Sequence, residues 1–342
     1  MPSPETLSPP RPGASLAGRR VLVTGAAGFI GSHLTEALLG LGAEVTAFIR
    51  YSSRGEIGAL ARIGRDALSR LRIVSGDLKD PAAVLQVMHG VDVAFHLGAL
   101  IGIPYSYIHP IDYVQTNVVG TANVLEACRA CGVSRLVQFS TSEVYGTARY
   151  APIDEDHPLQ GQSPYSASKI GADQLALSYF RSFGLPVAIA RPFNTYGPGQ
   201  PARAIIPTII GQALKGPVVR LGALTPTRDM NYVADTVAGT LRIAETESAI
   251  GEVINLGSGH EISVGDIAQV VFRAIGGDFR IETDPTRLRP EKSEVFRLIA
   301  DCGKAERLLG WRPTVAVDEG IARTVAWARA NPVLLRVEHY QV

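Results

Sequence analysis

A tyrosine and a lysine four residues apart are the pair with the clearest chemical potential in this sequence. Tyr165 and Lys169 stand in the stretch YSASK, at the start of a segment, 165–183, whose spacing predicts a long helix. Residues four apart share one face of a helix. A lysine cation held there lowers the pKa of the phenol, so that the tyrosine can act as a base near neutral pH. The same spacing also arises by chance in surface pairs.

A triplet of threonine, serine and glutamate supplies further polar groups upstream. Thr141, Ser142 and Glu143 follow residues 136–140, a short apolar run that we predict to be a buried strand. Ligands of open parallel sheets bind at the carboxyl ends of the strands, so the triplet is expected in the site. The Thr141 hydroxyl can share a substrate proton with Tyr165, and the Glu143 carboxylate can remove a proton from carbon. Alternatively, Glu143 only caps a helix or turn.

A glycine-rich turn near the start of the chain has the pattern GxxGxxG. It follows a predicted strand at 20–24 and opens a predicted helix at 30–39. Glycines let the backbone approach a pyrophosphate closely, and the N-terminus of a helix favours negative charge. The alternative is a tight turn between strand and helix with no ligand. The residues expected to hold a dinucleotide are Gly25, Gly28, Phe29, Ile30 and Gly31.

The end of the next predicted strand, 44–49, distinguishes the two nicotinamide cofactors. NAD sites commonly carry an acidic residue there, which binds the ribose 2′-hydroxyl. This chain has no carboxylate at that position. Arg50, Ser52, Ser53 and Arg54 could instead hold a 2′-phosphate. The sequence therefore favours NADP over NAD, although the loop could also be exposed and have no cofactor role.

Two further strand ends belong to the same predicted site. Asp77 and Leu78 follow a predicted strand at 71–75, where Asp77 could accept a hydrogen bond from the adenine amino group or cap the next helix. Leu97 and Ala99 follow a predicted strand at 91–97 and are expected on the nicotinamide side. We interpret His96 as a packing residue.

The elements that must position these groups alternate regularly between strand and helix. Such alternation is typical of an α/β fold with a doubly wound parallel sheet, the Rossmann arrangement. Beyond about residue 194 the segments become shorter and mixed, which predicts a smaller mixed α/β substrate domain. The expected division is a disordered tail at 1–18, a dinucleotide-binding domain at 19–193 and 228–258, and a substrate domain at 194–227 and 259–342. Further predicted elements are a helix at 116–131 and a strand at 187–190.

Composition excludes several classes of protein. Of 342 residues, 46% are hydrophobic and 19% charged, which excludes a disordered chain and a small disulfide scaffold. A net charge of +1 offers no electrostatic footprint for nucleic acid or an anionic membrane. Three cysteines and the lack of an apolar signal segment or membrane span favour a cytoplasmic protein. Cys128 and Cys131 are expected to pack in a helix, since the sequence shows no further metal ligands near them.

Eight stretches occur together and in a characteristic order. They are TGAAGFIGSHL, GDL, HLGA, NVVGTANVLEA, STSEVYG, YSASK, RPFNTYGP and RDMNYV. Over about residues 19–330 the chain resembles the extended short-chain dehydrogenases/reductases of the nucleotide-sugar epimerase/dehydratase family. The longer strings STSEVYGTA and PLQGQSPYSASKIGADQ look like the dehydratases of legionaminic-acid-type pathways, which are similar to GDP-mannose 4,6-dehydratases. The loop at 50–53 also resembles the NADP-binding loop of the latter.

The resemblance implies roles for individual residues. Tyr165 and Lys169 match the base pair of the family, Thr141 its hydroxyl partner and Glu143 the dehydratase carboxylate. Asn117 matches an asparagine beside the active site, and the implied substrate-binding residues are Asn194, Arg203, Arg228 and Arg289. Many of these dehydratases have an aspartate before the glutamate, where this chain has Ser142. The acid role would then also belong to Glu143.

The implied activity is that of a nucleotide-sugar 4,6-dehydratase. UDP-glucuronate decarboxylation, 5,6-dehydration and 4-epimerisation stay open as alternatives within the same family. A non-catalytic dinucleotide sensor is disfavoured, because such proteins typically lose the tyrosine and lysine. The resemblance also implies a homodimer formed by the helices that contain residues 116 and 165. The sequence does not decide between UDP and GDP, or which sugar is attached.

Overall fold

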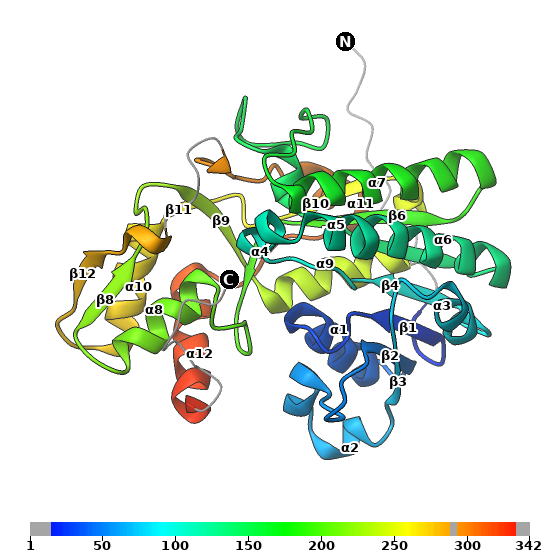
Figure 1. The fold of residues 1–342 in the computed structure, drawn as a ribbon, viewed down its shortest axis with the longest axis horizontal. Helices are drawn as coiled ribbons and strands as arrows, with labels where there is room; N and C mark the ends of the chain where they lie inside the picture. Colours follow the sequence, from blue (N-terminus) through cyan, green and yellow to red (C-terminus); the bar gives the residue numbers. More distant parts are fainter. Residues whose placement is uncertain (1–14, 288–292, 333–342) are drawn as a thin grey trace, which may run out of the picture.

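The chain is built on a seven-stranded parallel sheet, seen in the computed structural model, which describes residues 15–287 and 293–332 (Figure 1). The strand order is β10-β6-β5-β4-β1-β2-β3. This is a doubly wound α/β arrangement, as predicted. The strands are β1 (Arg20–Thr24), β2 (Glu44–Arg50), β3 (Arg72–Gly76), β4 (Val93–His96), β5 (Arg135–Phe139), β6 (Val187–Pro192) and β10 (Val253–Leu256).

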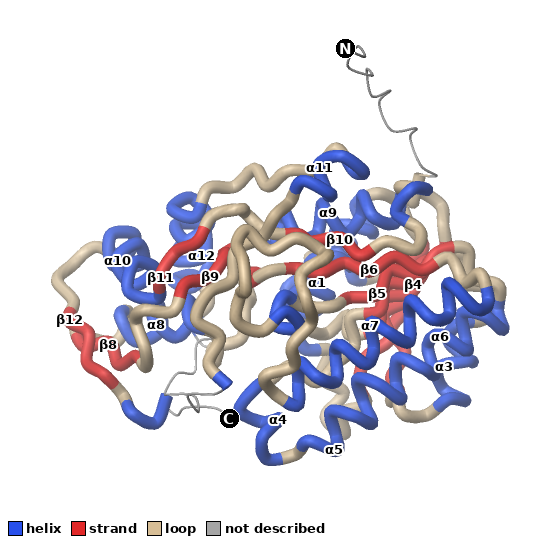
Figure 2. Tube along the Cα trace, turned by 90° about the horizontal axis from the view of Figure 1, so that it is seen from above, coloured by secondary structure: helices blue, strands red, loops and turns tan. Residues whose placement is uncertain are grey.

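Helices cover both faces of this sheet because successive residues of its strands are apolar on both sides. In β1, Val21 and Val23 belong to the hydrophobic cluster on one face, and Leu22 belongs to the cluster on the other. The first face carries α1 (Phe29–Gly40) and α9 (Val233–Glu245). The opposite face carries α3 (Pro81–Met88), α6 (Gly120–Cys131) and α7 (Pro164–Phe183), of which α6 and α7 run side by side in Figure 2.

Residues before Arg19 already take part in the fold, contrary to the sequence-based expectation. Leu16 is 2% exposed and packs in the main core cluster, and the Gly18 amide donates to the Gly42 carbonyl. The expected tail at 1–18 therefore ends too late, because residues 15–18 already belong to the fold. Residues 1–14 of that expected tail lie outside the described residues.

The segment predicted to be one helix at 116–131 contains two types of helix. Its first part, η2 (Val114–Val119), is a π-helix, and α6 continues from Gly120 to Cys131. Gly132 ends it in the left-handed conformation, with a φ of 65°. Short π-helical turns within helices often occur at functional sites. Upstream lie α4 (Ile103–Ile108) and α5 (Pro110–Tyr113).

The smaller part of the molecule contains two short sheets. One has the order β11-β9-β7, and the other pairs β12 with β8. The segment 228–258, expected to return to the large sheet, does so only through α9 and β10, because β9 pairs with β7 and β11 instead. The strands are β7 (Asn194–Tyr196), β8 (Val218–Leu221), β9 (Thr227–Tyr232), β11 (Glu261–Ser263) and β12 (Arg280–Thr283).

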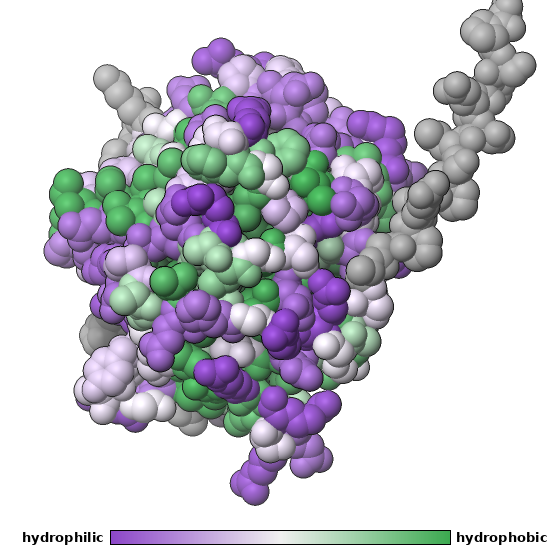
Figure 3. Space-filling model, turned by 90° about the vertical axis from the view of Figure 1, so that its right-hand side faces the viewer, coloured by the Kyte–Doolittle hydropathy of each residue, from purple (hydrophilic) through white to green (hydrophobic). Residues whose placement is uncertain are grey.

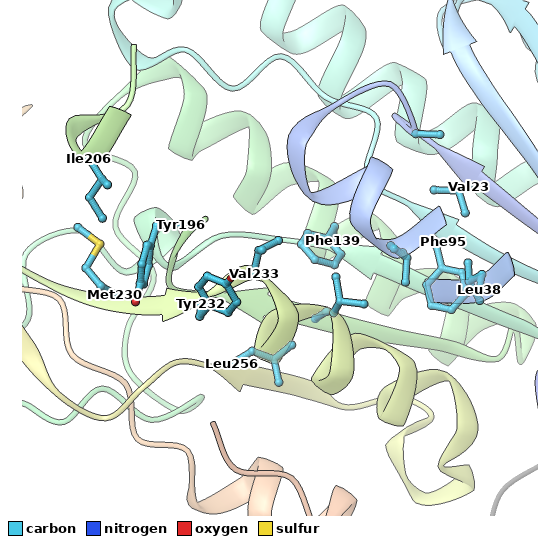
Figure 4. Packing of buried hydrophobic residues seen from close by; sticks show 14 of the residues in the cluster. Val23, Leu38, Phe95, Phe139, Tyr196, Ile206, Met230, Tyr232, Val233 and Leu256 are labelled. Carbon is cyan, nitrogen blue, oxygen red and sulfur yellow. The ribbon is translucent and has the colours of Figure 1, made fainter. Parts of the chain in front are cut away.

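One hydrophobic cluster joins the two parts. It runs from Val23, Leu38 and Phe95 around the large sheet to Tyr232 and Ile206 in the smaller part (Figure 4). The predicted two domains therefore share a core. The remaining helices that pack in this region are α8 (Ile205–Ala213), α10 (Val264–Ile275), α11 (Gly303–Leu309) and α12 (Val317–Ala330).

The remaining short elements lie in the connections between these strands and helices. They are η1 (Gly58–Arg62), α2 (Arg65–Leu68), η3 (Ser142–Tyr145), η4 (Glu247–Ala249) and η5 (Pro285–Arg287). Within the described ranges, no helix is long and apolar enough to cross a bilayer. On the face drawn in Figure 3, hydrophobic and hydrophilic residues are interspersed.

Candidate active site

The glycine turn lies where the strand order of the large sheet reverses. β1 has β2 on one side and β4 on the other, and crevices at such switch points bind ligands in α/β sheets. Gly25 has a φ of +70°, and a Cβ on it would lie 2.7 Å from the Gly98 amide nitrogen after β4. A Cβ on Gly31 would lie 2.3 Å from the Gly25 carbonyl oxygen. Only glycine permits these approaches.

The N-terminus of α1 is suited to bind a diphosphate. Gly28 occupies the N-cap position, so no side chain caps the first turn. The first amides of a helix have no intrahelical acceptor, and they point toward a ligand placed there. Phe29 and Ile30 contribute backbone amides of this turn. The residues present therefore fit the pyrophosphate of a dinucleotide, as the glycine pattern predicts.

The loop after β2 presents arginine and serine side chains without a carboxylate at the strand end. Arg50 and Arg54 are exposed, and Arg54 lies 3.9 Å from Glu56. Ser52 and Ser53 complete the loop, and the Ser52 hydroxyl accepts from the Arg54 amide at 3.3 Å. The loop is thus open to a ligand at the place where the sequence predicts a 2′-phosphate.

The helix cap that Asp77 could have supplied is made by another residue. Asp80 caps α3 by accepting from the Ala82 and Ala83 amides. Asp77 instead accepts from the Lys79 amide at 2.9 Å and stays half-buried at the end of β3. This removes the helix-cap alternative for Asp77, and a role toward adenine stays a prediction.

The residues expected on the nicotinamide side surround Gly98. Leu78 closes over this glycine, because a Cβ on Gly98 would lie 2.6 Å from the Leu78 Cδ1 atom. Leu97 and Ala99, on either side of Gly98, are half-buried. Strands β1, β3 and β4 therefore bring their carboxyl ends together here.

His96 is buried in a hydrogen-bond network that fixes a neutral imidazole. Its Nδ1 lies 2.7 Å from the Thr24 hydroxyl, which also accepts from the Gly98 amide and therefore donates to the ring. Its Nε2 lies 3.1 Å from Thr121, whose hydroxyl proton goes to the Asn117 carbonyl, so Nε2 donates. Burial and, to a smaller extent, the charge of Lys169 lower the pKa of His96 to about 3. The prediction that His96 is a packing residue is confirmed.

Tyr165 and Lys169 lie on the first two turns of α7, which begins with a capping box. Ser163 accepts from the Ser166 amide, and Ser166 in turn accepts from the Ser163 amide. The Lys169 ammonium is buried and donates to the Phe139 carbonyl at 2.6 Å. The tyrosine and lysine are therefore held at the end of β5.

The environment of Tyr165 differs from the sequence-based expectation. Burial raises the pKa of Tyr165, a hydrogen bond with the Thr141 side chain opposes that rise, and the charge of Glu143 adds to it. Lys169 was expected to lower this pKa, but burial is the larger effect, and its ammonium is bound to a carbonyl. The side chains of Thr141 and Tyr165 thus lie next to each other, and their shared role in proton transfer stays a prediction.

Glu143 lies beside this pair with its carboxylate unused by the fold. Thr141 caps η3 by accepting from the Glu143 amide at 3.3 Å, so the glutamate is not the cap. Within the described ranges, the half-buried Glu143 carboxylate makes no hydrogen bond or ion pair. Ser142 is buried next to it. The capping alternative for Glu143 is therefore wrong.

Asn117 joins the loop after β4 to the helix that carries Tyr165. Its side chain accepts from the Leu100 amide at 2.8 Å and donates to the Leu100 carbonyl at 2.9 Å. It also donates to Ser168, whose hydroxyl donates to the Tyr165 carbonyl. Asn117 lies in the π-helical turn and is 1% exposed. Through these hydrogen bonds it fixes the loop after β4 against α7.

The expected substrate residues have different surroundings. Arg228 is buried, donates to the Thr227 carbonyl and lies 3.3 Å from the Glu294 carboxylate. The buried amide oxygen of Asn194 has no hydrogen-bond partner among the described residues. Arg203 is exposed, and its charge lowers the pKa of Tyr113. Arg289 lies outside the described residues.

Tyr113 is a residue of the site that the sequence reasoning missed. Its ring packs edge-on against Tyr165 with 6.2 Å between centroids, and its hydroxyl donates to the Gly102 carbonyl. Burial raises the pKa of Tyr113 to about 12. Its position four residues before Asn117 would have placed both on one helix face, which is the signal that could have found it.

The fold and the site define a dinucleotide-binding enzyme of the extended short-chain dehydrogenase/reductase type. A family model described as GDP-mannose 4,6 dehydratase matches residues 22–324. The chain therefore belongs to this family of nucleotide-sugar dehydratases and epimerases.

Individual relatives include both kinds of enzyme. A dTDP-glucose 4,6-dehydratase of Streptomyces antibioticus is 37% identical over 91% of this chain and 92% of the relative. A UDP-glucuronate 4-epimerase of Thermodesulfobacterium geofontis is 33% identical over 92% of this chain and 98% of the relative. A crystal structure of a double mutant of the dTDP-glucose 4,6-dehydratase of Streptomyces venezuelae, with NAD bound, has a TM-score of 0.83 and 34% identity, covering 92% of this chain and 98% of that one.

Acidification should weaken the fold through His96. Its pKa is depressed in the folded state, so its contribution is fully present above the unfolded value of 6.5 and is lost as the pH falls toward about 3. The free energy of unfolding should fall by up to about 1.4 kcal/mol per pH unit in this range. Urea unfolding of the unmodified protein and of His96→Gln at about pH 7 and about pH 5 measures the difference.

The His96→Gln protein should be less stable at neutral pH but should lose less stability on acidification. His260→Gln, which changes an exposed histidine, is the matched control. An equal pH dependence in His96→Gln and in the unmodified protein would show that the imidazole is not held neutral.

Proposed function

We propose that this enzyme is a nucleotide-sugar 4,6-dehydratase that works with a bound nicotinamide dinucleotide. The observation that carries the proposal is the free carboxylate of Glu143 beside the paired side chains of Thr141 and Tyr165. A hydride-transferring site alone needs the tyrosine and the threonine. Loss of water from a sugar needs, in addition, a group that removes a proton from carbon.

Each side chain of the site has a task in this reaction. Tyr165 removes the proton of the sugar 4-hydroxyl, Thr141 shares that proton, and the Lys169 cation supports the phenolate. When bound, the dinucleotide accepts a hydride from C4 and returns it to C6, so no second redox substrate is needed. The 4-ketone acidifies the C5 proton, which Glu143 removes.

Departure of the 6-hydroxyl requires a proton as well. Ser142 supplies no carboxylate at the neighbouring position, so Glu143 passes the proton taken from C5 to the leaving hydroxyl, which departs as water. Glu143 then takes a proton from solvent and gives it to C5 as C6 is reduced, and Tyr165 releases the proton of the 4-hydroxyl to solvent. The product is a 4-keto-6-deoxy sugar, still attached to its nucleoside diphosphate.

The substrate diphosphate is assigned to the arginines of the smaller part. Arginine binds phosphate through two parallel hydrogen bonds, which suits Arg203, Arg228 and Arg289. The unpartnered amide oxygen of Asn194 can accept from a sugar hydroxyl. Because dTDP-glucose dehydratases are among the relatives, dTDP joins UDP and GDP as a candidate nucleotide of the substrate.

The second candidate is 4-epimerisation, because a UDP-glucuronate 4-epimerase is among the relatives. An epimerase uses Tyr165, Lys169 and Thr141 in the same way and returns the hydride to C4. It leaves Glu143 without a task, and for that reason we place dehydration first.

Glu143→Gln should separate the two reactions. Formation of the dehydrated product should fall about 10²–10⁴-fold, the usual contribution of a general base. Oxidation at C4 should persist, because Tyr165 and Thr141 are unchanged. We would incubate the protein with NAD or NADP and with dTDP-glucose, GDP-mannose or UDP-N-acetylglucosamine. Product mass and the absorbance of reduced nicotinamide are the two measurements.

Two variants serve as references in that experiment. Tyr165→Phe should abolish both readouts, and Glu44→Gln, which changes an exposed glutamate at the start of β2, should change neither. A Glu143→Gln protein that turns over at the unmodified rate would refute the carboxylate's role and bring epimerisation forward.

We further propose that NADP binds more tightly than NAD, because Arg50 stands where an acidic residue would bind the ribose. Arg50→Asp should shift the preference toward NAD by about 1–3 kcal/mol, the scale of a hydrogen bond to a charged group. Calorimetric titration with both cofactors measures it. Arg72→Asp, an equal charge change at the opposite end of the neighbouring strand β3, should leave the ratio unchanged. Equal affinities in the unmodified protein would contradict the proposal.

We propose a homodimer in which α6 and α7 of each subunit meet those of the other. Support comes from exposed apolar side chains along the helical segment that leads into α6, namely Ile108, Ile111, Val114 and Val119. Ile111→Asp should dissociate the dimer at micromolar concentration, as measured by sedimentation. Leu41→Asp, at an exposed leucine beyond α1, should leave it intact. A monomeric unmodified protein would overturn the proposal.

We infer that the enzyme works in the cytoplasm. Its three cysteines, Cys128, Cys131 and Cys302, are all free thiols in the structure, which suits a reducing compartment. Burial raises the pKa of the Cys128 thiol, so it is unreactive. Among the described residues, no cluster of metal ligands includes these cysteines.

A further inference from the structure

Asp173 is a buried carboxylate two turns along α7 from Tyr165 and one turn from Lys169. One of its oxygens accepts from the Ser140 hydroxyl at 2.5 Å and from the Arg191 guanidinium at 2.8 Å. Both members of the ion pair are almost wholly buried, at 0% exposure for the Asp173 side chain and 3% for that of Arg191. A buried ion pair of this kind adds little to the stability of the fold by itself, so stability alone does not explain why the pair is present.

The pair is connected to every segment that carries a proposed catalytic residue. Ser140 directly precedes Thr141. Arg191, on β6, donates to the Tyr145 hydroxyl at 2.9 Å and lies over the Tyr145 ring at 4.8 Å. Tyr145 ends η3, the turn that contains Glu143, and donates to Asn255 on β10 at 2.7 Å. Asp173 thus stands where α7, β5, β6 and η3 meet.

Apart from Asp173, few of the described groups can stabilise the positive charge of Lys169 in this buried position. Its ammonium is buried and has a single carbonyl, that of Phe139, as its hydrogen-bond partner among the described residues. Burying an ammonium is costly unless an opposite charge lies near it. Burial lowers the pKa of Lys169, and the carboxylate of Asp173 raises it.

We propose that Asp173 is a positioning residue for the reaction: it keeps Lys169 protonated, and through Ser140 and Arg191 it fixes Thr141 and Glu143 relative to Tyr165. The proposal rests on the proposed function only for the task of these groups. The charged state of Lys169 is a property of the protein alone and can be measured without a substrate.

Among the described residues, the charged and titratable groups that act on Lys169 directly are Asp173 on α7 and the neutral His96 on β4. Behind them, Glu143 on η3 and Tyr113 on α5 act on Tyr165, and Arg191 on β6 binds Asp173. Replacement of Asp173 by asparagine leaves Lys169 and Arg191 as two buried cations. Replacement of Arg191 by glutamine leaves Asp173 as a counter-charge for Lys169 alone. The two changes should therefore shift the titration of Lys169 in opposite directions.

The experiment is an NMR titration of lysine side chains in the full-length protein, as purified and with added NAD. The chain has five lysines, so side-chain labelling gives few signals, and Lys169→Arg assigns the one of interest. In Asp173→Asn the midpoint of Lys169 should fall by about one pH unit or more, the effect of losing a nearby opposite charge. In Arg191→Gln the midpoint should rise.

Matched variants separate this effect from a general loosening of the fold. Asp235→Asn changes another buried carboxylate, one that accepts from the Thr314 hydroxyl and the Val315 amide and does not act on Lys169, and it should not move the Lys169 signal. Asp173→Glu should restore most of the titration midpoint. Ser140→Ala keeps both charges, so it should leave the midpoint in place and lower kcat with little change in KM.

Two results would overturn the proposal. The first is an unchanged Lys169 midpoint in a folded Asp173→Asn protein. The second is a shift in the same direction in the Asp173 and Arg191 variants, as a loosened fold would give. If Asp173→Asn does not fold, the rise expected in Arg191→Gln decides. Failure of the dehydratase assay would leave these titrations intact, so the two proposals can fail separately.

Discussion

The constraint on which the site depends is a positively charged ammonium group that is buried away from bulk solvent. The ammonium of Lys169 lies inside the protein, on the Phe139 carbonyl, and needs a counter-charge. Asp173 supplies it, Arg191 balances Asp173, and Tyr145 accepts a hydrogen bond from the other terminal nitrogen of that guanidinium. Each partner comes from a different element. The helix with the tyrosine, the strand end with the threonine and the turn with the glutamate are therefore held in one arrangement.

In the reaction that we propose, the step that separates a dehydratase from an epimerase depends on one side chain that the fold leaves unused. Thr141 closes the turn η3 by itself, which releases Glu143 from any structural task. A neighbouring aspartate would divide the transfer of protons between two carboxylates, whereas Ser142 leaves it to one. If Glu143 has this role, the residues of the turn after β5 distinguish the reactions that the same scaffold can carry out on a C4 ketone.

Much of the large sheet could be predicted from the sequence, since its strands are short apolar runs that end at glycine or a polar group. The pairs Tyr165–Lys169 and Thr141–Glu143 were found because their spacing brings them to a single strand end. Asp173 was missed, since a charged residue on a helix resembles a solvent-facing one, and its partner Arg191 is distant in sequence. The π-helical turn at Asn117 was missed too, because apolar periodicity does not separate it from an α-helix.

The hydrophobic cluster that passes from Val23 and Phe95 to Tyr232 and Ile206 has a consequence for how the enzyme exchanges its ligands. A cleft between two independent bodies can open by a hinge. Here, opening would expose the shared apolar surface to water, at a free-energy cost that grows with the area uncovered. A hinge motion that separates the two parts is therefore unfavourable, and the molecule should melt as one cooperative unit.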